Sequence, residues 1–347
     1  MSGTGLSDIE HLRLETNGIH LHVASLGEGP LVVMCHGFPG LWYSWRKQLP
    51  AIAAAGFRAV AVDTRGYGRS DRPIDVAAYD SEIQVADLLG VLDALGEEQA
   101  IFIGQDFGAP LVWNLCVRAA ERVKAAVVIG VPFDFEGAGS EAAEGDAELS
   151  GGAGMPPSEQ YKQVAQEHFF HMHYFQQIGP ADSELGNNPR EFLTRLYWAL
   201  SARGNLLDWR DFPSAGTAYL DVLEPPAEPL PWPWLSAEDM DYMVQEYTCT
   251  GADTAFIGGL SAYRVADRNW EIAKRYQGIG VTAPVLFLMG EQDPVREMMP
   301  TAAFEHMSAG VPKLQGPHYI ANAGHFVMQE APEAVNKLIL PFLEQQR

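Results

Sequence analysis

The chain has 347 residues, and its 23 basic and 45 acidic side chains give a net charge of −22 with histidine neutral. Hydrophobic residues make up 47% of it, which is ample material for the core of a large globular domain. The acidity excludes nucleic acids and anionic membrane surfaces as partners, because both require a basic face. No basic leader with an apolar run opens the chain, and no apolar run approaches the roughly 18 residues of a membrane span, so we expect a cytoplasmic protein.

The first half of the chain alternates between patterns of strands and helices. Alternating segments at 12–16 and 19–23 flank the pair Asn17-Gly18, which predicts an antiparallel hairpin. Apolar runs without polar alternation then predict strands that are buried on both faces, at 31–35, 58–62, 100–104, 125–129 and 284–289. Helical spacing predicts helices at 83–95, 110–120 and 333–343. We therefore expect an α/β fold with a mostly parallel sheet and helices on both of its faces.

This alternation breaks after Pro132. Residues 134–150 include many acids and no basic residue, and helical, aromatic-rich segments follow to about residue 275. Prolines crowd 225–233, which must therefore be a loop. The predicted organisation is a core built from 1–134 and 276–347, interrupted by a helical cap at 135–275.

The most informative motif is Gly104-Gln-Asp106-Phe-Gly108, between a predicted strand and a predicted helix. Its small residues let the chain turn sharply and expose the middle side chain, as in a nucleophile elbow. Aspartate, with a reference pKa of about 3.9, needs no base to become a nucleophile, and it can displace at an electrophilic sp³ carbon. The resulting ester then needs a histidine-activated water and an oxyanion hole. The alternative, that Asp106 merely caps a helix, leaves the glycines unexplained.

The other parts of such a site occur in the expected chain order. The loop His36–Gly40 follows the first parallel strand, and the backbone amides of Phe38 and Phe107 are the predicted oxyanion hole. Asp293 follows the strand at 284–289, and His325 lies further along the chain. The order nucleophile, acid, histidine is typical of this kind of site.

With these residues the sequence resembles the α/β-hydrolase fold enzymes and, among them, the soluble epoxide hydrolases. The resemblance implies that an epoxide alkylates Asp106 and that water activated by His325 and Asp293 hydrolyses the ester to a vicinal diol. It implies a small-molecule epoxide and water as partners, no cofactor and no metal, and it leaves a homodimer open. It rests on His36–Pro39, Asp63–Ser70, the motif around Asp106, Gly290–Asp293, Gly324-His325 and two cap motifs.

Ring opening produces an alkoxide, which needs a hydrogen-bond donor. The family supplies it from two cap tyrosines, and the second of these matches Tyr263. The first stands three residues before an aromatic, Phe, Gln triplet, and here that position is His171, before Tyr174-Phe-Gln176. A His/Tyr pair resembles the Cif-like branch of epoxide hydrolases. A histidine with an ordinary pKa near 6.5 would add a titration to the alkylation step.

Some assignments stay open at this point. Tyr174 competes with His171 as the second donor, and Tyr174 and Trp42 are the predicted substrate-binding residues. The Cif-like branch places its triad acid after an earlier strand, so that Asp134 is an alternative to Asp293. The crowding of His168, His171 and His173 does not predict a metal site, because these spacings do not share one helical face.

Two other functions compete with epoxide hydrolysis. Haloalkane dehalogenases resemble this sequence but place Trp after the nucleophile to hold the halide, where Phe107 has no donor. A non-catalytic ligand receptor could keep the same pocket, although the intact Asp106, His325 and Tyr263 disfavour it.

Overall fold

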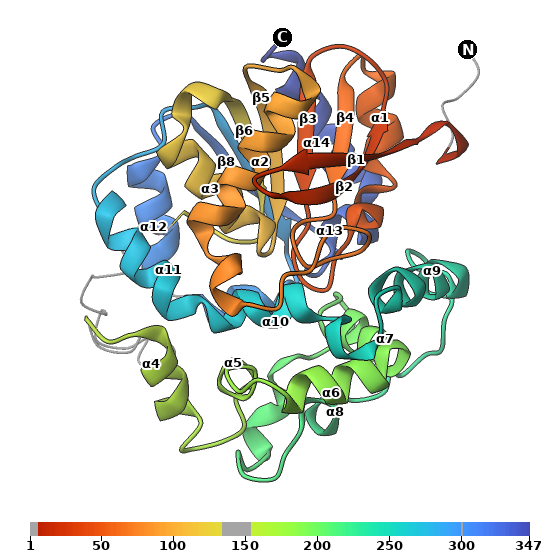
Figure 1. Ribbon diagram of the computed structural model, residues 1–347, viewed down its shortest axis with the longest axis vertical. Coiled ribbons are helices and arrows are strands. Elements are labelled where there is room, and N and C mark those ends of the chain that lie inside the picture. The colour runs from red at the N-terminus through yellow and green to blue at the C-terminus, as the bar shows by residue number, and fades with distance from the viewer. Residues whose placement is uncertain (1–5, 134–153, 300) are drawn as a thin grey trace.

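A mostly parallel sheet forms the centre of the computed structural model, which describes residues 6–133, 154–299 and 301–347 (Figure 1). The strand order is β1-β2-β4-β3-β5-β6-β7-β8. The pairs β1–β2 and β2–β4 are antiparallel and the other neighbours are parallel, which confirms the predicted hairpin and fold class. The strands are β1 (Glu10–Thr16), β2 (Ile19–Leu26), β3 (Leu31–Cys35), β4 (Arg58–Val62), β5 (Ala100–Gln105), β6 (Val123–Ile129), β7 (Val285–Gly290) and β8 (Leu314–Ile320).

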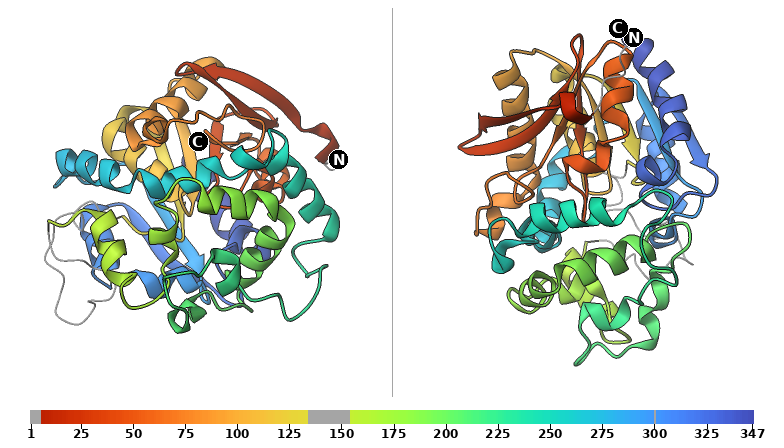
Figure 2. Two further views of the ribbon diagram at one scale, coloured as in Figure 1. Left: turned by 60° about the horizontal axis from the view of Figure 1, so that its bottom comes forward. Right: turned by 90° about the vertical axis from the view of Figure 1, so that its right-hand side faces the viewer.

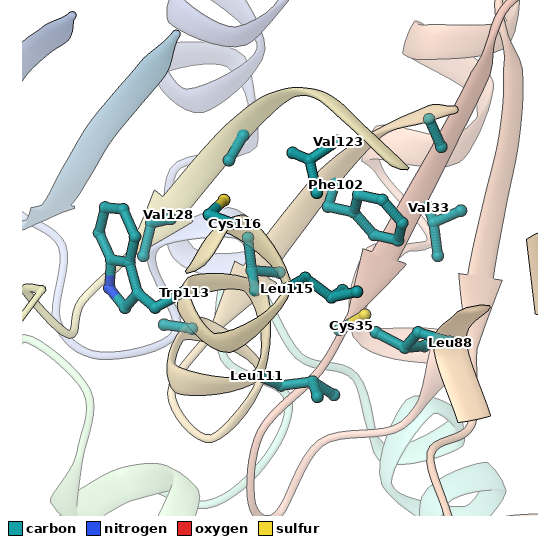
Figure 3. Close-up of a cluster of buried hydrophobic side chains, with 14 of the residues drawn as sticks. Val33, Cys35, Leu88, Phe102, Leu111, Trp113, Leu115, Cys116, Val123 and Val128 are labelled. Atoms are coloured by element: carbon teal, nitrogen blue, oxygen red, sulfur yellow. The ribbon is translucent and has the colours of Figure 1, made fainter. Parts of the chain in front are cut away.

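Helices cover both faces of the sheet because successive side chains of the central strands point to opposite faces. Val32 and Met34 of β3 belong to a buried cluster with α1 and α14, whereas Val33 and Cys35 belong to a cluster with α2, α3 and α12. Figure 3 shows the second cluster, in which Leu111 and Leu115 of α3 lie near side chains of the strands. These helices are α1 (Gln48–Ala54), α2 (Ser81–Leu95), α3 (Gly108–Arg118), α12 (Thr301–Gly310), α13 (Val327–Glu330) and α14 (Pro332–Glu344).

The remaining helices form a cap beyond one end of the sheet. Figures 1 and 2 show α4 to α9 gathered there, with α10 and α11 between them and the core. The cap has an apolar cluster of its own, which also includes Phe38, Tyr67 and Phe326 from the core. The cap helices are α4 (Pro157–Val164), α5 (His171–Tyr174), α6 (Pro180–Asn187), α7 (Pro189–Ala199), α8 (Tyr219–Val222), α9 (Ala237–Thr248), α10 (Ile257–Arg264) and α11 (Ala266–Ala273).

The structure describes one of the two predicted cap boundaries and the proline-rich loop. Its boundary at residue 135, like Asp134, lies outside the described residues, and its boundary at 275 falls within the short 3₁₀ helix Lys274–Tyr276. The proline-rich segment 225–233 contains no helix and no named strand, as predicted. Within the described ranges, no helix is long and apolar enough to cross a membrane.

Candidate active site

Asp106 lies in a sharp turn between β5 and α3. Its φ of 53° is in the left-handed region, which a non-glycine residue seldom adopts. The turn is tight on both sides, since a Cβ on Gly104 would collide with the Gly108 carbonyl and one on Gly108 with the Cys35 carbonyl. The glycines on each side of Asp106 are therefore required by space, and the strained turn directs the carboxylate away from the sheet.

Two groups from distant loops contact the Asp106 carboxylate. The amide of Phe38 donates a 2.7 Å hydrogen bond to Oδ1, and His325 Nε2 lies 3.3 Å from Oδ2. A side chain at Gly37 would overlap the same carboxylate, so this loop can approach only with glycine there. Among the described residues, Phe38 is the only one whose backbone amide donates to this carboxylate, and the Phe107 amide does not.

Asp293 holds the other side of the His325 ring. Both of its carboxylate oxygens lie close to Nδ1, at 3.1 and 3.0 Å, and both residues are buried. Burial by itself lowers the pKa of His325, but the charge of Asp293 and the contacts with Asp106 outweigh it and raise the pKa to about 10. The structure thus brings together Asp106, His325 and Asp293 in a line, with the imidazole between two carboxylates.

A cavity of about 580 Å³ lies between the core and the cap, and both Asp106 and His325 line it. Tyr263 of α10 lines it as well, with its ring centroid 4.9 Å from that of Phe107. His171 begins α5, and its ring centroid lies 5.7 Å from that of Tyr263. The structure therefore brings the predicted pair His171 and Tyr263 together in the wall of the cavity that contains Asp106.

His171 cannot supply the titration that the sequence predicts. The side chain is buried against the rings of Trp209 and Tyr219, with centroids 5.0 and 5.8 Å away. Burial lowers the pKa of His171 to about 3, and no charged group offsets this effect. The imidazole is neutral at physiological pH, so the expectation of a titration near 6.5 is wrong.

Two predicted substrate-binding residues lie outside the cavity wall. The Tyr174 hydroxyl donates a 2.8 Å hydrogen bond to Glu184 of the cap, and Tyr174 does not line the cavity. Trp42 is buried in the core, where its indole nitrogen donates to the Tyr242 hydroxyl at 2.9 Å and its ring packs against His11. In this structure neither residue is placed to touch a ligand beside Asp106, and Tyr174 does not stand with Tyr263 as a second donor.

Tyr219 is one of the cavity residues that the sequence does not single out. Tyr219 lines the cavity, and its ring is nearly parallel to that of His171, at 27°. The sequence shows it only as one of many aromatic residues in the cap, because no spacing relates it to a motif. Among His168, His171 and His173, only His171 lines the cavity. Within the described ranges, no group of three or more potential ligands is placed to hold a metal ion.

Comparison with known proteins gives a consistent result. The family described as alpha/beta hydrolase fold matches residues 30–332. The sequence is 37% identical to epoxide hydrolase A of Mycobacterium tuberculosis, covering 95% of this chain and 96% of that protein. The crystal structure of epoxide hydrolase A from Mycobacterium thermoresistibile superposes with a TM-score of 0.83 at 37% identity, covering 97% of this chain and 98% of that one.

A second solved structure comes from another organism. An epoxide hydrolase from an endophytic Streptomyces superposes with a TM-score of 0.84 at 33% identity, and the match covers 97% of this chain and 96% of that one. The similarity therefore extends over core and cap alike. The chain belongs to the epoxide hydrolase family of the α/β-hydrolase fold.

Proposed function

We propose that the protein hydrolyses epoxides to vicinal diols through an ester intermediate on Asp106. The observation that carries this proposal is the surroundings of the Asp106 carboxylate, which lies between the Phe38 amide and His325 in a cavity that Tyr263 also lines. The Tyr263 hydroxyl makes no hydrogen bond among the described residues. A phenol with a free donor suits the oxygen that is released when an epoxide opens. The names of the similar proteins support the same substrate class.

In the first step Asp106 attacks an epoxide carbon. Because the Phe38 amide holds Oδ1, the attacking atom is Oδ2, which forms a bond to carbon as the carbon–oxygen bond of the ring breaks. The ring oxygen leaves as an alkoxide that remains attached to the substrate. Tyr263 and neutral His171 donate hydrogen bonds to it. The alkoxide takes the Tyr263 hydroxyl proton to become the first hydroxyl of the diol, and the tyrosinate regains a proton from solvent water.

In the second step water attacks Cγ of the ester. His325 Nε2 removes a proton from this water, and the charge that develops on Oδ1 is stabilised by the amide of Phe38, which already donates to that oxygen. Collapse of the intermediate breaks the bond between Cγ and Oδ2. The protonated imidazole then gives its proton to Oδ2, which leaves as the second hydroxyl of the diol, while the water oxygen stays in the Asp106 carboxylate.

Esterification itself prepares His325 for its role as a base. In the free enzyme its raised pKa, about 10, keeps the imidazole protonated. The ester removes the charge of Asp106, so the pKa of His325 falls and the proton is released. We therefore expect ester hydrolysis to speed up as pH rises through the lowered pKa, whereas alkylation stays flat between about pH 6 and pH 9. Stopped-flow kinetics across this range would measure both steps, and an alkylation rate that rises with the hydrolysis rate would contradict the scheme.

Loss of either ring-oxygen donor is expected to slow only the first step. Tyr263→Phe and His171→Phe should each reduce the alkylation rate by about 10²-fold, the usual effect of losing one donor to a developing oxyanion. Hydrolysis of the ester should be nearly unchanged, because the alkoxide forms only in the first step. Single-turnover kinetics separates the two rates.

The matched control for this pair is Tyr174→Phe. Its hydroxyl is bonded to Glu184 and its ring does not line the cavity, so alkylation should stay close to the wild-type rate. If Tyr174→Phe abolished alkylation while His171→Phe was silent, the second donor would be Tyr174.

The proposed function is tested by product analysis. The purified protein is incubated with styrene oxide, cyclohexene oxide, epoxyhexane and bromobutane, and diols and bromide are measured. We expect diol from at least one epoxide and no bromide, and no diol from Asp106→Asn. Bromide release without diol would show a dehalogenase, and ligand binding without any product would show a receptor.

A further inference from the structure

The peptide that carries His325 is fixed by groups from both the core and the cap. The His325 amide donates to the Leu200 carbonyl of the cap at 2.9 Å. Its carbonyl accepts a 3.2 Å hydrogen bond from the side chain of Gln105, at the end of β5. A catalytic histidine on a loop needs such restraints, since small displacements of a reacting group greatly reduce rate.

One carboxylate connects the loop around His325 to the cap. Glu330, the last residue of α13, accepts hydrogen bonds from the amides of Gly324 at 3.0 Å and Phe326 at 3.1 Å, which are the two neighbours of His325. The oxygen that binds Gly324 also accepts the amide of Ala202 in the cap, at 2.9 Å. One side chain therefore holds both residues adjacent to His325 and the cap segment against which they pack.

The surroundings of Glu330 set it apart from a surface glutamate. No lysine or arginine among the described residues pairs with it, and three backbone amides are its hydrogen-bond partners. The loop and the cap are in direct contact there, since a Cβ on Gly324 would collide with the Ala202 amide. Glu330 is only partly exposed, and the three amide donors offset the cost of taking its carboxylate out of water.

We propose that Glu330 is a positioning residue of the active site. It keeps the His325 imidazole facing Asp106, and it links this placement to the cap segment 200–202. This inference rests on the proposed two-step function, because His325 acts only on the ester. Misplacing the imidazole then slows the second step and leaves the first nearly unchanged.

The test is Glu330→Gln, which keeps one acceptor oxygen and turns an amide NH₂ toward at least one of the three backbone amides that the carboxylate now accepts. With styrene oxide as the probe, single-turnover kinetics should show ester hydrolysis slowed about 10- to 100-fold and alkylation changed by less than about threefold. The ester should accumulate, and intact-protein mass spectrometry should detect an adduct equal to the mass of styrene oxide. Glu333→Gln, an exposed glutamate three residues on, is the matched control and should behave as the wild type.

The outcomes separate this inference from the proposed function. If the wild type forms no diol and His325→Gln traps no adduct with any epoxide, the function itself fails. If both occur but Glu330→Gln slows the two steps equally, or only lowers the melting temperature, the positioning role is overturned. Glu330→Asp keeps the charge with a shorter reach and should give the same pattern with a smaller effect. If neither variant folds, the inference is also overturned, because the carboxylate then holds the fold rather than the imidazole.

Discussion

His325→Gln is expected to stop turnover and to leave the substrate covalently attached to Asp106. Alkylation needs only the Asp106 carboxylate and the donors around the ring oxygen, whereas hydrolysis of the ester needs a base on Nε2, which lies 3.3 Å from Oδ2. Loss of a general base costs about 10²- to 10⁴-fold, so the ester should persist for many turnover times. Intact-protein mass spectrometry should show an increase equal to the mass of the epoxide, on the peptide that contains Asp106.

The matched control is Asp106→Asn, whose amide is a far weaker nucleophile. It should show neither product nor adduct under the same conditions. An adduct on Asp106→Asn, or the absence of an adduct on His325→Gln in a protein whose wild type makes diol, would refute a covalent role for this carboxylate.

Asp293→Asn is expected to have an effect comparable to that of His325→Gln, of up to about 10⁴-fold by analogy with the triad acid of serine proteases. The contacts of Asp293 with Nδ1 of His325 fix the tautomer whose Nε2 faces Asp106. An asparagine can donate to Nδ1 instead and so stabilise the wrong tautomer. Ester hydrolysis should therefore slow far more than alkylation in single-turnover experiments, and the alkyl-enzyme should accumulate.

The alternative acid provides the control for this prediction. Asp134 lies outside the described residues, and Asp134→Asn should leave both steps unchanged. If Asp134→Asn slowed ester hydrolysis and Asp293→Asn did not, the triad acid would follow the strand β6 rather than β7.

The central strands could be predicted because burial on both faces leaves a continuous apolar run, as in β3 and β7. The strand β8 could not, since it contains Gly316-Pro317, most of its side chains are not buried, and it forms one edge of the sheet. Proline lacks the amide that a central strand must donate, and an edge strand tolerates that loss. The sequence pattern of β8 is thus that of a loop.

The candidate site was predictable where its chemistry depends on local spacing. The turn at Asp106 needs glycines two residues away on each side, and this pattern is visible in the sequence. The position of Tyr174 depends instead on Glu184, a hydrogen bond that no local pattern indicates. The neutrality of His171 likewise depends on burial against Trp209, which only the folded cap produces. In the sequence, Glu330 is indistinguishable from other glutamates in helical segments, because its three amide partners come together only in the folded structure.

The central claim, an ester on Asp106, is tested most directly by one turnover in water enriched in the heavy oxygen isotope, with enzyme in excess over the epoxide. Mass spectrometry then follows the label in the diol and in the peptide that contains Asp106. Because water attacks Cγ and Oδ2 leaves with the product, we expect an unlabelled diol and a label in the Asp106 carboxylate. A labelled diol with an unlabelled Asp106 would show that water attacks the epoxide directly, and it would contradict the covalent mechanism.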